Sequence, residues 1–135
     1  MSQQFKHVAL IGLGLIASSI SHAMRRANMD ARITGYAKSA TTRGKAREIG
    51  LCDKVYNSIT DTVRGADLVI LAVPVGAMGA VSAEIAPYLK KGAVITDVGS
   101  VKRAVIKAVA PNVPKGVHFV PGHPLAGTEK SGPEA

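Results

Sequence analysis

The chain has 135 residues, 47% of them hydrophobic and 4% aromatic, which allows one compact domain with an aliphatic core and argues against an aromatic-rich β-sandwich. Seventeen Lys and Arg against nine Asp and Glu give a formal charge of +8, which favours an anionic partner. Because these basic residues are scattered and not interleaved with aromatic residues, we expect an anionic small molecule in a cleft, not a nucleic acid.

The first predicted elements are a buried strand over residues 8–11 and a helix after it. The apolar strand ends at Gly12, and apolar residues then recur at helical spacing. The predicted apolar stripe of this helix is Ile16, Ile20, Ala23 and Ala27. Residues 8–20 also imitate a secretory signal sequence, but two glycines interrupt the run. The run is also shorter than the roughly 20 residues of a membrane span, so we expect neither a signal peptide nor a membrane protein.

Further strands and helices alternate along the rest of the chain. The later strands are predicted at residues 32–36, 66–73, 93–96 and 117–120. The later helices are predicted at residues 41–49, at about 75–89 and at about 100–110. Strands that alternate with helices of this length predict βαβ units. The expected fold is therefore α/β, a Rossmann-type doubly wound, mainly parallel sheet with helices on both faces.

The loop between the first strand and the first helix carries a glycine pattern typical of dinucleotide binding. Its residues are Gly12, Leu13, Gly14, Leu15, Ile16 and Ala17. Gly12 permits the tight turn, Gly14 leaves room for a pyrophosphate beside the helix amides, and Ala17 is small enough for helix–strand contact. The alternative interpretation is that these glycines only shape a turn in another α/β protein.

The end of the second strand bears on the choice between NAD and NADP. In NAD-binding domains, an acidic residue about 20 positions on holds the ribose hydroxyls. Asp30 has that separation but precedes the second strand, and the strand end at Tyr36 and Ala37 carries no carboxylate. Basic and hydroxyl side chains follow instead, namely Lys38, Ser39, Thr42 and Arg43. They favour NADP because they suit a 2′-phosphate, although a solvated helix start would also explain them.

Ligands in open α/β sheets bind beyond the carboxyl ends of the strands, which singles out three more segments. We expect a cofactor to pass Val73, Pro74, Asp97 and Gly99. His123 follows the last strand and is the best candidate to accept a hydroxyl proton as hydride leaves. Ser100 would orient His123 or the substrate, or would only cap a helix.

The remaining histidines and the cysteine are expected to have no catalytic role. His118 lies inside a predicted strand and is expected to be packed or hydrogen-bonded, whereas His7 and His22 are expected at the surface. The single Cys52 allows no internal disulfide, and no Cys/His ligand spacing is present. This composition predicts a reducing, cytoplasmic location and no metal site.

Four segments together resemble the prephenate/arogenate dehydrogenases: residues 8–18, 71–74, 96–102 and 122–132. The resemblance implies NAD(P)-dependent oxidative decarboxylation of a small dicarboxylate, prephenate or arogenate, in tyrosine biosynthesis. Hydride would pass from the ring carbinol to nicotinamide. The resemblance also implies that His123 accepts the proton of the ring hydroxyl, that Ser100 holds the same hydroxyl, and that Thr128 and Glu129 line the substrate pocket.

The resemblance further implies that residues 1–135 form the dinucleotide-binding domain alone. The family continues into a helical dimerisation domain, so we expect an incomplete chain, weak catalysis by it and a homodimer formed through the missing region. The sequence does not decide between prephenate and arogenate. Two alternatives stay open: a related 3-hydroxyacid or imine dehydrogenase, and a non-catalytic NAD(P)-binding module.

Overall fold

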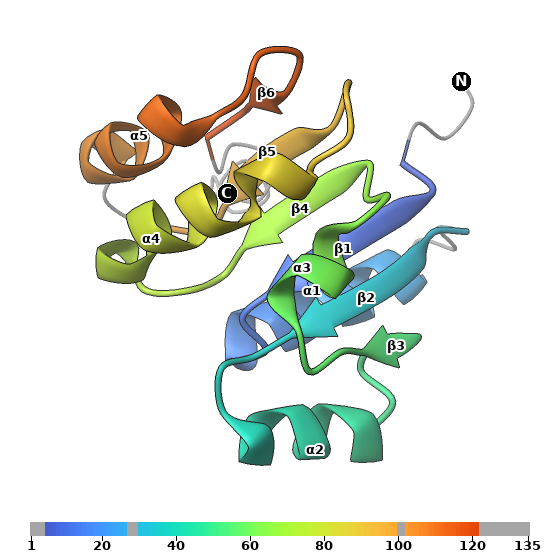
Figure 1. Ribbon diagram of the computed structural model, residues 1–135. Coiled ribbons are helices and arrows are strands. Elements are labelled where there is room, and N and C mark those ends of the chain that lie inside the picture. The colour runs from blue at the N-terminus through green and yellow to red at the C-terminus, as the bar shows by residue number, and fades with distance from the viewer. Residues whose placement is uncertain (1–4, 27–29, 100–101, 122–135) are drawn as a thin grey trace.

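The computed structural model describes residues 5–26, 30–99 and 102–121, which form one parallel sheet with helices on both faces (Figure 1). The sheet has six strands in the order β3-β2-β1-β4-β5-β6, and each neighbouring pair is parallel. The strands are β1 His7–Ile11, β2 Arg32–Tyr36, β3 Lys54–Val55, β4 Leu68–Leu71, β5 Val94–Asp97 and β6 His118–Phe119. This order confirms the predicted doubly wound sheet.

Two helical layers cover the sheet. The helices are α1 Leu15–Arg26, α2 Ala40–Glu48, α3 Ile59–Val63, α4 Val75–Ile85 and α5 Lys102–Val109, with 3-10 turns η1 Ala86–Tyr88 and η2 Ala110–Asn112. Val8 and Leu10 of β1 pack with α1 and α2, whereas Ala9 and Ile11 pack with α3, α4 and α5. Because β1 side chains alternate between the two faces of the sheet, they pack into two separate hydrophobic cores. None of the described helices is long and apolar enough to cross a bilayer.

The buried stripe of α1 differs from the predicted one. Ile20 is buried as expected, but Ala23 is exposed, and the residues that pack inward with Ile20 are Ala17, Ser21 and Met24. The prediction overlooked Ser21 because it counted only apolar residues. Ser21 is buried because its hydroxyl has a backbone acceptor, as described below. Ala27 and the side chain of Ile16 lie outside the described part.

Two elements between residues 51 and 65 were not predicted. Strand β3 has only two residues, and α3 has five. A local signal for α3 does exist, because the Ser58 hydroxyl accepts a hydrogen bond from the backbone N–H of Asp61 at its start. No comparable signal marks β3, whose pairing with β2 is non-local.

Two histidines lie in other surroundings than predicted. His118 was expected to be packed or hydrogen-bonded, but its side chain is exposed because β6 is a two-residue strand and the last strand of the described sheet. His7 was expected at the surface, but it is half-buried, with its Nε2 atom 2.8 Å from the Thr34 Oγ1 atom. The Thr34 hydroxyl donates its only proton to the Thr62 carbonyl, so the His7 ring must donate from Nε2. His22 is exposed, as predicted.

Candidate functional site

The carboxyl ends of four parallel strands lie side by side. They bring the predicted cofactor residues together at that end of the sheet. Ile11 of β1 is paired with Tyr36 of β2 and with Leu71 of β4, and Leu71 is paired with Asp97 of β5. The glycine-rich loop, the β2–α2 turn, the β4–α4 turn and the β5 end therefore follow one another along this edge. This is the edge at which doubly wound sheets bind ligands.

Gly12 is required by the backbone itself. Its φ is +99°, and a Cβ atom at this position would lie 2.5 Å from the Ala72 carbonyl oxygen. Its N–H donates to the Tyr36 carbonyl at 2.7 Å, which ties the loop to β2. Any other residue here would be strained and would also clash with the backbone of the neighbouring strand end.

Gly14 differs from Gly12 because the space around it is open. It is exposed, and a Cβ atom added to it would meet no heavy atom within 4 Å. The Gly14 carbonyl accepts from the Ser18 N–H at 3.0 Å, so α1 starts directly at this open position. The first turn of α1 contains no acidic residue, which leaves the positive end of its dipole available to an anion.

The other residues of the loop support this geometry. Leu13 is buried, and Ala17 is fully buried against the core beneath α1, where a small side chain was predicted. Leu15 and Ile16 begin α1, but their side chains lie outside the described part.

The end of β2 carries no carboxylate, as predicted. Tyr36 is half-buried and Ala37 is buried, whereas Lys38 and Ser39 are exposed. Ser39 also caps α2, since its hydroxyl accepts from the Thr42 N–H at 3.3 Å. Asp30 precedes β2 and so lies at the opposite edge of the sheet from the glycine-rich loop.

Arg43 has partners within the protein. Its Nη1 atom donates to the carbonyls of Ala37 at 2.6 Å and Lys38 at 3.0 Å, and its Nε atom donates to Asn57 at 3.2 Å. The guanidinium also lies 5.7 Å from the centre of the Tyr36 ring. Arg43 thus stabilises the β2–α2 turn through hydrogen bonds to its backbone. Its role as a cofactor ligand stays a prediction.

A cavity of about 460 Å³ lies between α1 and α2 and borders the glycine-rich loop. Its lining residues are Leu13, Gly14, Ser18, Thr41, Thr42, Lys45, Ala46, Ile49 and Leu51. Sequence reasoning had not singled out Lys45 or Ser18. The signal that would have indicated Lys45 is its spacing with Thr41 and Ile49, which places these three side chains on one face of α2; no such pattern indicates Ser18 on α1.

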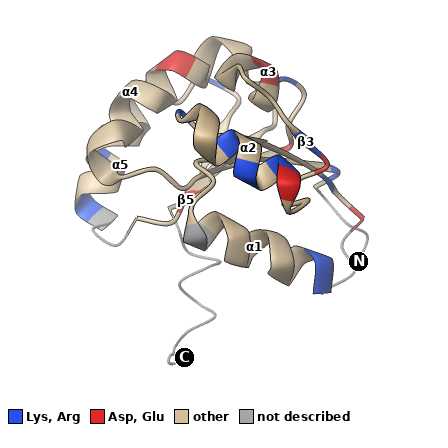
Figure 2. Cartoon of the chain, turned by 90° about the horizontal axis from the view of Figure 1, so that it is seen from below, with Lys and Arg blue, Asp and Glu red and all other residues tan. Residues whose placement is uncertain are grey.

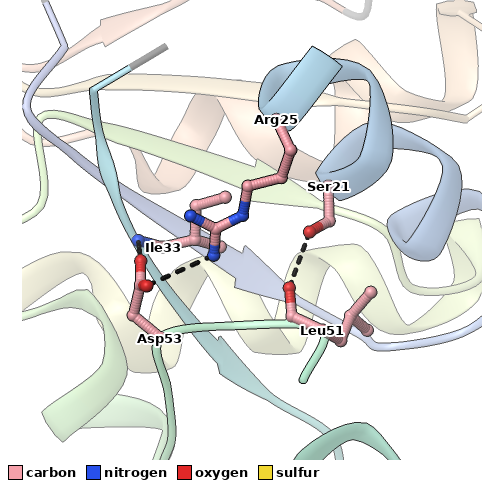
Figure 3. Close-up of polar contacts among 5 residues, drawn as sticks. All are labelled: Ser21, Arg25, Ile33, Leu51 and Asp53. Carbon is pink, nitrogen blue, oxygen red and sulfur yellow. Dashed lines mark hydrogen bonds and ion pairs between the residues drawn. The ribbon is translucent and has the colours of Figure 1, made fainter. Parts of the chain in front are cut away.

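Polar contacts fix α1 against residues 51–53, of which Leu51 lines the cavity (Figure 3). The Ser21 hydroxyl donates to the Leu51 carbonyl at 2.6 Å, and the Arg25 guanidinium lies 3.3 Å from the Asp53 carboxylate. The same carboxylate accepts from the Ile33 N–H at 2.7 Å. Helix α1, the segment that leads into β3, and β2 are therefore joined by these contacts.

The end of β5 is tightly packed. Asp97 is fully buried, and its carboxylate accepts from the Gly99 N–H at 2.7 Å. A Cβ atom at Gly99 would lie 2.6 Å from Val105 of α5, so this turn has no room for a larger residue. Val73 is half-buried, and the exposed Pro74 is the N-cap of α4. These four residues lie on the predicted edge, and their contact with a cofactor stays a prediction.

The predicted catalytic and substrate residues, Ser100, His123, Thr128 and Glu129, lie outside the described residues. Their roles therefore stay predictions. Within residues 5–26, 30–99 and 102–121, no group of three or more His, Cys, Asp or Glu side chains could hold a metal ion.

Two of the groups with a shifted pKa, His7 and Asp67, lie away from the glycine-rich loop. Burial and the Arg32 guanidinium lower the pKa of His7 below its usual 6.5. Burial alone would raise the pKa of Asp67, but hydrogen bonds from Lys90 and from the N–H groups of His7 and Lys6 lower it below 3.8. These groups lie at the end of the sheet where the strands begin.

The Cys52 thiol is the third group with a shifted pKa. Burial, with the Asp53 carboxylate adding to it, raises that pKa to about 11. A thiol with this pKa is protonated at neutral pH and is a poor nucleophile, so the structure gives Cys52 no catalytic role.

Comparisons with known proteins agree with the geometry. Residues 20–135 match the family described as prephenate dehydrogenase, nucleotide-binding domain. A cyclohexadienyl dehydrogenase from Zymomonas mobilis is 52% identical over 131 residues, which cover 97% of this chain and 44% of that protein. A prephenate dehydrogenase from Lactococcus lactis is 36% identical over 133 residues, covering 94% of this chain and 36% of that protein.

A solved structure is also similar, that of prephenate dehydrogenase from A. aeolicus in complex with hydroxyphenyl propionate and NAD+. The TM-score is 0.81 at 30% identity, with 96% of this chain and 45% of that chain covered. The present chain spans less than half the length of each of these three proteins.

Proposed function

The chain belongs to the prephenate dehydrogenase family, as its nucleotide-binding domain, and we propose that it provides the NAD(P) site for oxidative decarboxylation of prephenate or arogenate in tyrosine biosynthesis. The observation that carries this proposal is the contrast within the glycine-rich loop. Gly12 is fixed by its positive φ and by the Ala72 carbonyl, whereas Gly14 is open to solvent at the start of α1.

The described residues fit a dinucleotide. The N–H groups in the first turn of α1 would hold the pyrophosphate, because they point out of the helix and Gly14 leaves room for close approach. When bound, the nicotinamide supplies the hydride acceptor. The β5 end, fixed by Asp97 and Gly99, would exclude water on the same edge of the sheet.

The acid–base chemistry is assigned to residues outside the described part. In this proposal His123 accepts the proton of the ring hydroxyl as hydride leaves, and Ser100 holds the same hydroxyl. Thr128 and Glu129 line the substrate pocket. Loss of the ring hydride leaves a dienone, and expulsion of CO2 then makes the ring aromatic, so the reaction runs in one direction. We propose that this reaction takes place in the cytoplasm. We also propose that the enzyme is a homodimer formed through a region beyond this chain.

We further propose that NADP is preferred over NAD. The support is the end of β2, where Lys38 and Ser39 are exposed and no carboxylate stands between Tyr36 and Ser39. A carboxylate at this position would repel a 2′-phosphate, whereas a lysine and a hydroxyl attract it.

Calorimetry with NADP and NAD on this chain tests cofactor binding directly. Binding of either dinucleotide is expected, with NADP the tighter; failure of both to bind would contradict the proposal, and tighter NAD binding would contradict the preference.

Turnover with prephenate and with arogenate, measured at 340 nm on a longer chain of the same protein, tests the reaction. His123→Asn in that chain should lower kcat by a factor of about 100 or more. Binding without turnover would favour the non-catalytic module, and a mild effect of His123→Asn would favour a related 3-hydroxyacid or imine dehydrogenase.

A further inference from the structure

Three segments that meet at the proposed cofactor site contain a single residue among Asp, Glu, Lys and Arg, and this residue is Asp97. The segments are residues 8–24 with the glycine-rich loop, residues 68–83 with the β4–α4 turn, and residues 92–101 with the end of β5. The basic residues of the helices lie instead on α1, α2 and α5 (Figure 2). Asp97 therefore supplies the only formal charge that these three segments bring to the site.

The Asp97 carboxylate is held in one position. The side chain is fully buried, and its Oδ2 atom accepts from the Gly99 N–H at 2.7 Å. Gly99 is itself enclosed, because an added Cβ atom would lie 2.6 Å from Val105 and 3.3 Å from Val75. The Val98 N–H donates to the backbone at the end of β4 at 3.1 Å. The negative charge is therefore fixed at the carboxyl end of β5.

The turn after β5 does not by itself explain a carboxylate. The contact with the Gly99 N–H needs an acceptor oxygen, which an Asn or Ser side chain would also supply. Burying a carboxylate costs more free energy than burying either of these neutral groups. A ligand that is attracted by the charge would account for an aspartate at this position.

We propose that the buried charge of Asp97 makes the site favour the oxidised dinucleotide over the reduced one. This inference rests on the proposed function, since it presumes a pyrophosphate at Gly14. The nicotinamide ring of NAD+ or NADP+ carries a positive charge, and the hydride that it accepts from the ring carbinol makes it neutral. Asp97 attracts the oxidised ring through this charge and has no such attraction for the reduced ring.

The place of Asp97 in the sheet suits this role. With the adenosine half of the dinucleotide at the end of β2, the nicotinamide half extends from Gly14 toward the ends of β4 and β5. Neighbouring strands lie about 4.8 Å apart, so the end of β5 is about 10 Å from the end of β1. A buried carboxylate acts over such a distance because the protein around it screens its charge weakly. Arg103 on α5 is exposed, so water screens its charge more strongly.

A preference for the oxidised form fits a reaction that runs in one direction. Because loss of CO2 already prevents the reverse reaction, the site gains nothing from holding the reduced dinucleotide. Weaker binding of the reduced form lets this product leave and lets the next oxidised dinucleotide enter.

Calorimetry with NAD+, NADH, NADP+ and NADPH on the wild-type chain and on Asp97→Asn, Asp97→Ser and Asp67→Asn tests the inference. The two Asp97 variants keep an acceptor for the Gly99 N–H and remove the charge. Asp67 is the matched control, because its carboxylate also accepts backbone N–H groups but lies at the opposite end of the sheet. Both Asp97 variants should raise the Kd of the oxidised forms about 3- to 10-fold and change the Kd of the reduced forms less than about twofold. Asp67→Asn should leave the ratio of the Kd values unchanged.

The outcomes separate this inference from the proposed function. Equal weakening of both redox forms in a folded Asp97 variant would show that Asp97 only shapes the turn, which overturns the inference and leaves the proposed function standing. An unchanged ratio, or the same shift in Asp67→Asn, would also overturn it. If the wild-type chain binds no dinucleotide, both fail. Urea midpoints show which variants fold; Asp97→Ser supplies the test if Asp97→Asn does not, and failure of both to fold would assign the charge to folding and overturn the inference.

Discussion

Alanine substitutions at Gly12 and at Gly14 should separate the two tasks of the glycine-rich loop, which are folding and cofactor binding. At Gly12 a side chain would be held at a φ of +99° and pressed against the Ala72 carbonyl at 2.5 Å. At Gly14 the same methyl group would stand in open space, with no positive φ. Gly12→Ala should therefore impair folding, whereas Gly14→Ala should fold and lose its ligand.

The expected magnitudes follow from these contacts. A left-handed alanine costs about 1–2 kcal/mol, and forcing a methyl group against packed backbone costs about 1–3 kcal/mol. The reduced freedom of the unfolded chain offsets about 0.4–1 kcal/mol of this. Gly12→Ala should therefore lower the free energy of unfolding by roughly 3 kcal/mol, within a range of about 1–5 kcal/mol. Only this offset applies to Gly14→Ala. Its free energy of unfolding should therefore equal that of the wild-type chain or be slightly higher.

Urea unfolding of the two variants and the wild-type chain measures the first effect, and calorimetry with NAD and NADP measures the second. We expect Gly14→Ala to weaken both dinucleotides more than about tenfold, because its methyl group occupies the space of the pyrophosphate. Equal destabilisation by the two substitutions would refute the packing argument. Wild-type affinity in Gly14→Ala would refute the placement of the pyrophosphate.

Three further predictions concern the scaffold. Ser21→Ala should lower the free energy of unfolding by about 1–2 kcal/mol because the Leu51 carbonyl loses its donor, whereas Ser19→Ala on the exposed side of α1 should not; urea midpoints decide. Cys52, with its pKa raised to about 11, should react slowly with iodoacetamide at pH 7.5 and rapidly in denaturant; fast labelling of the folded chain would contradict its burial. Because folding lowers the pKa of His7 and of Asp67, the unfolded chain takes up their protons first. The free energy of unfolding should therefore fall as the pH drops below about 6.5 and again below about 3.8, and Asp67→Asn should remove the second fall.

Much of the fold was predictable because its signals are local. The strand before Gly12 is a continuous apolar run, and Arg32–Tyr36 was predicted with the bounds that the structure has. Helix α2 begins at Ser39, whose hydroxyl caps it, and ends before Gly50, which adopts a φ of +68°. Such short-range features determine where an element begins and ends.

The parts that sequence reasoning missed depend on contacts between distant residues. Strand β3 exists because Lys54 pairs with Thr34 of β2, and two residues carry no periodicity to indicate this. The burial of Ser21 depends on the Leu51 carbonyl, which is 30 positions away. The cavity between α1 and α2 likewise follows from how the two helices pack, so its lining could not be deduced from either helix alone.

The formal charge of +8 illustrates the same difference between composition and structure. The composition favoured an anionic partner, as if all the basic residues acted together. In the structure Arg25 pairs with Asp53, Lys90 pairs with Asp67, and Arg43 and Arg47 hold backbone carbonyls. Attraction of an anion at the glycine-rich loop therefore depends on the side chains close to the loop and not on the total charge.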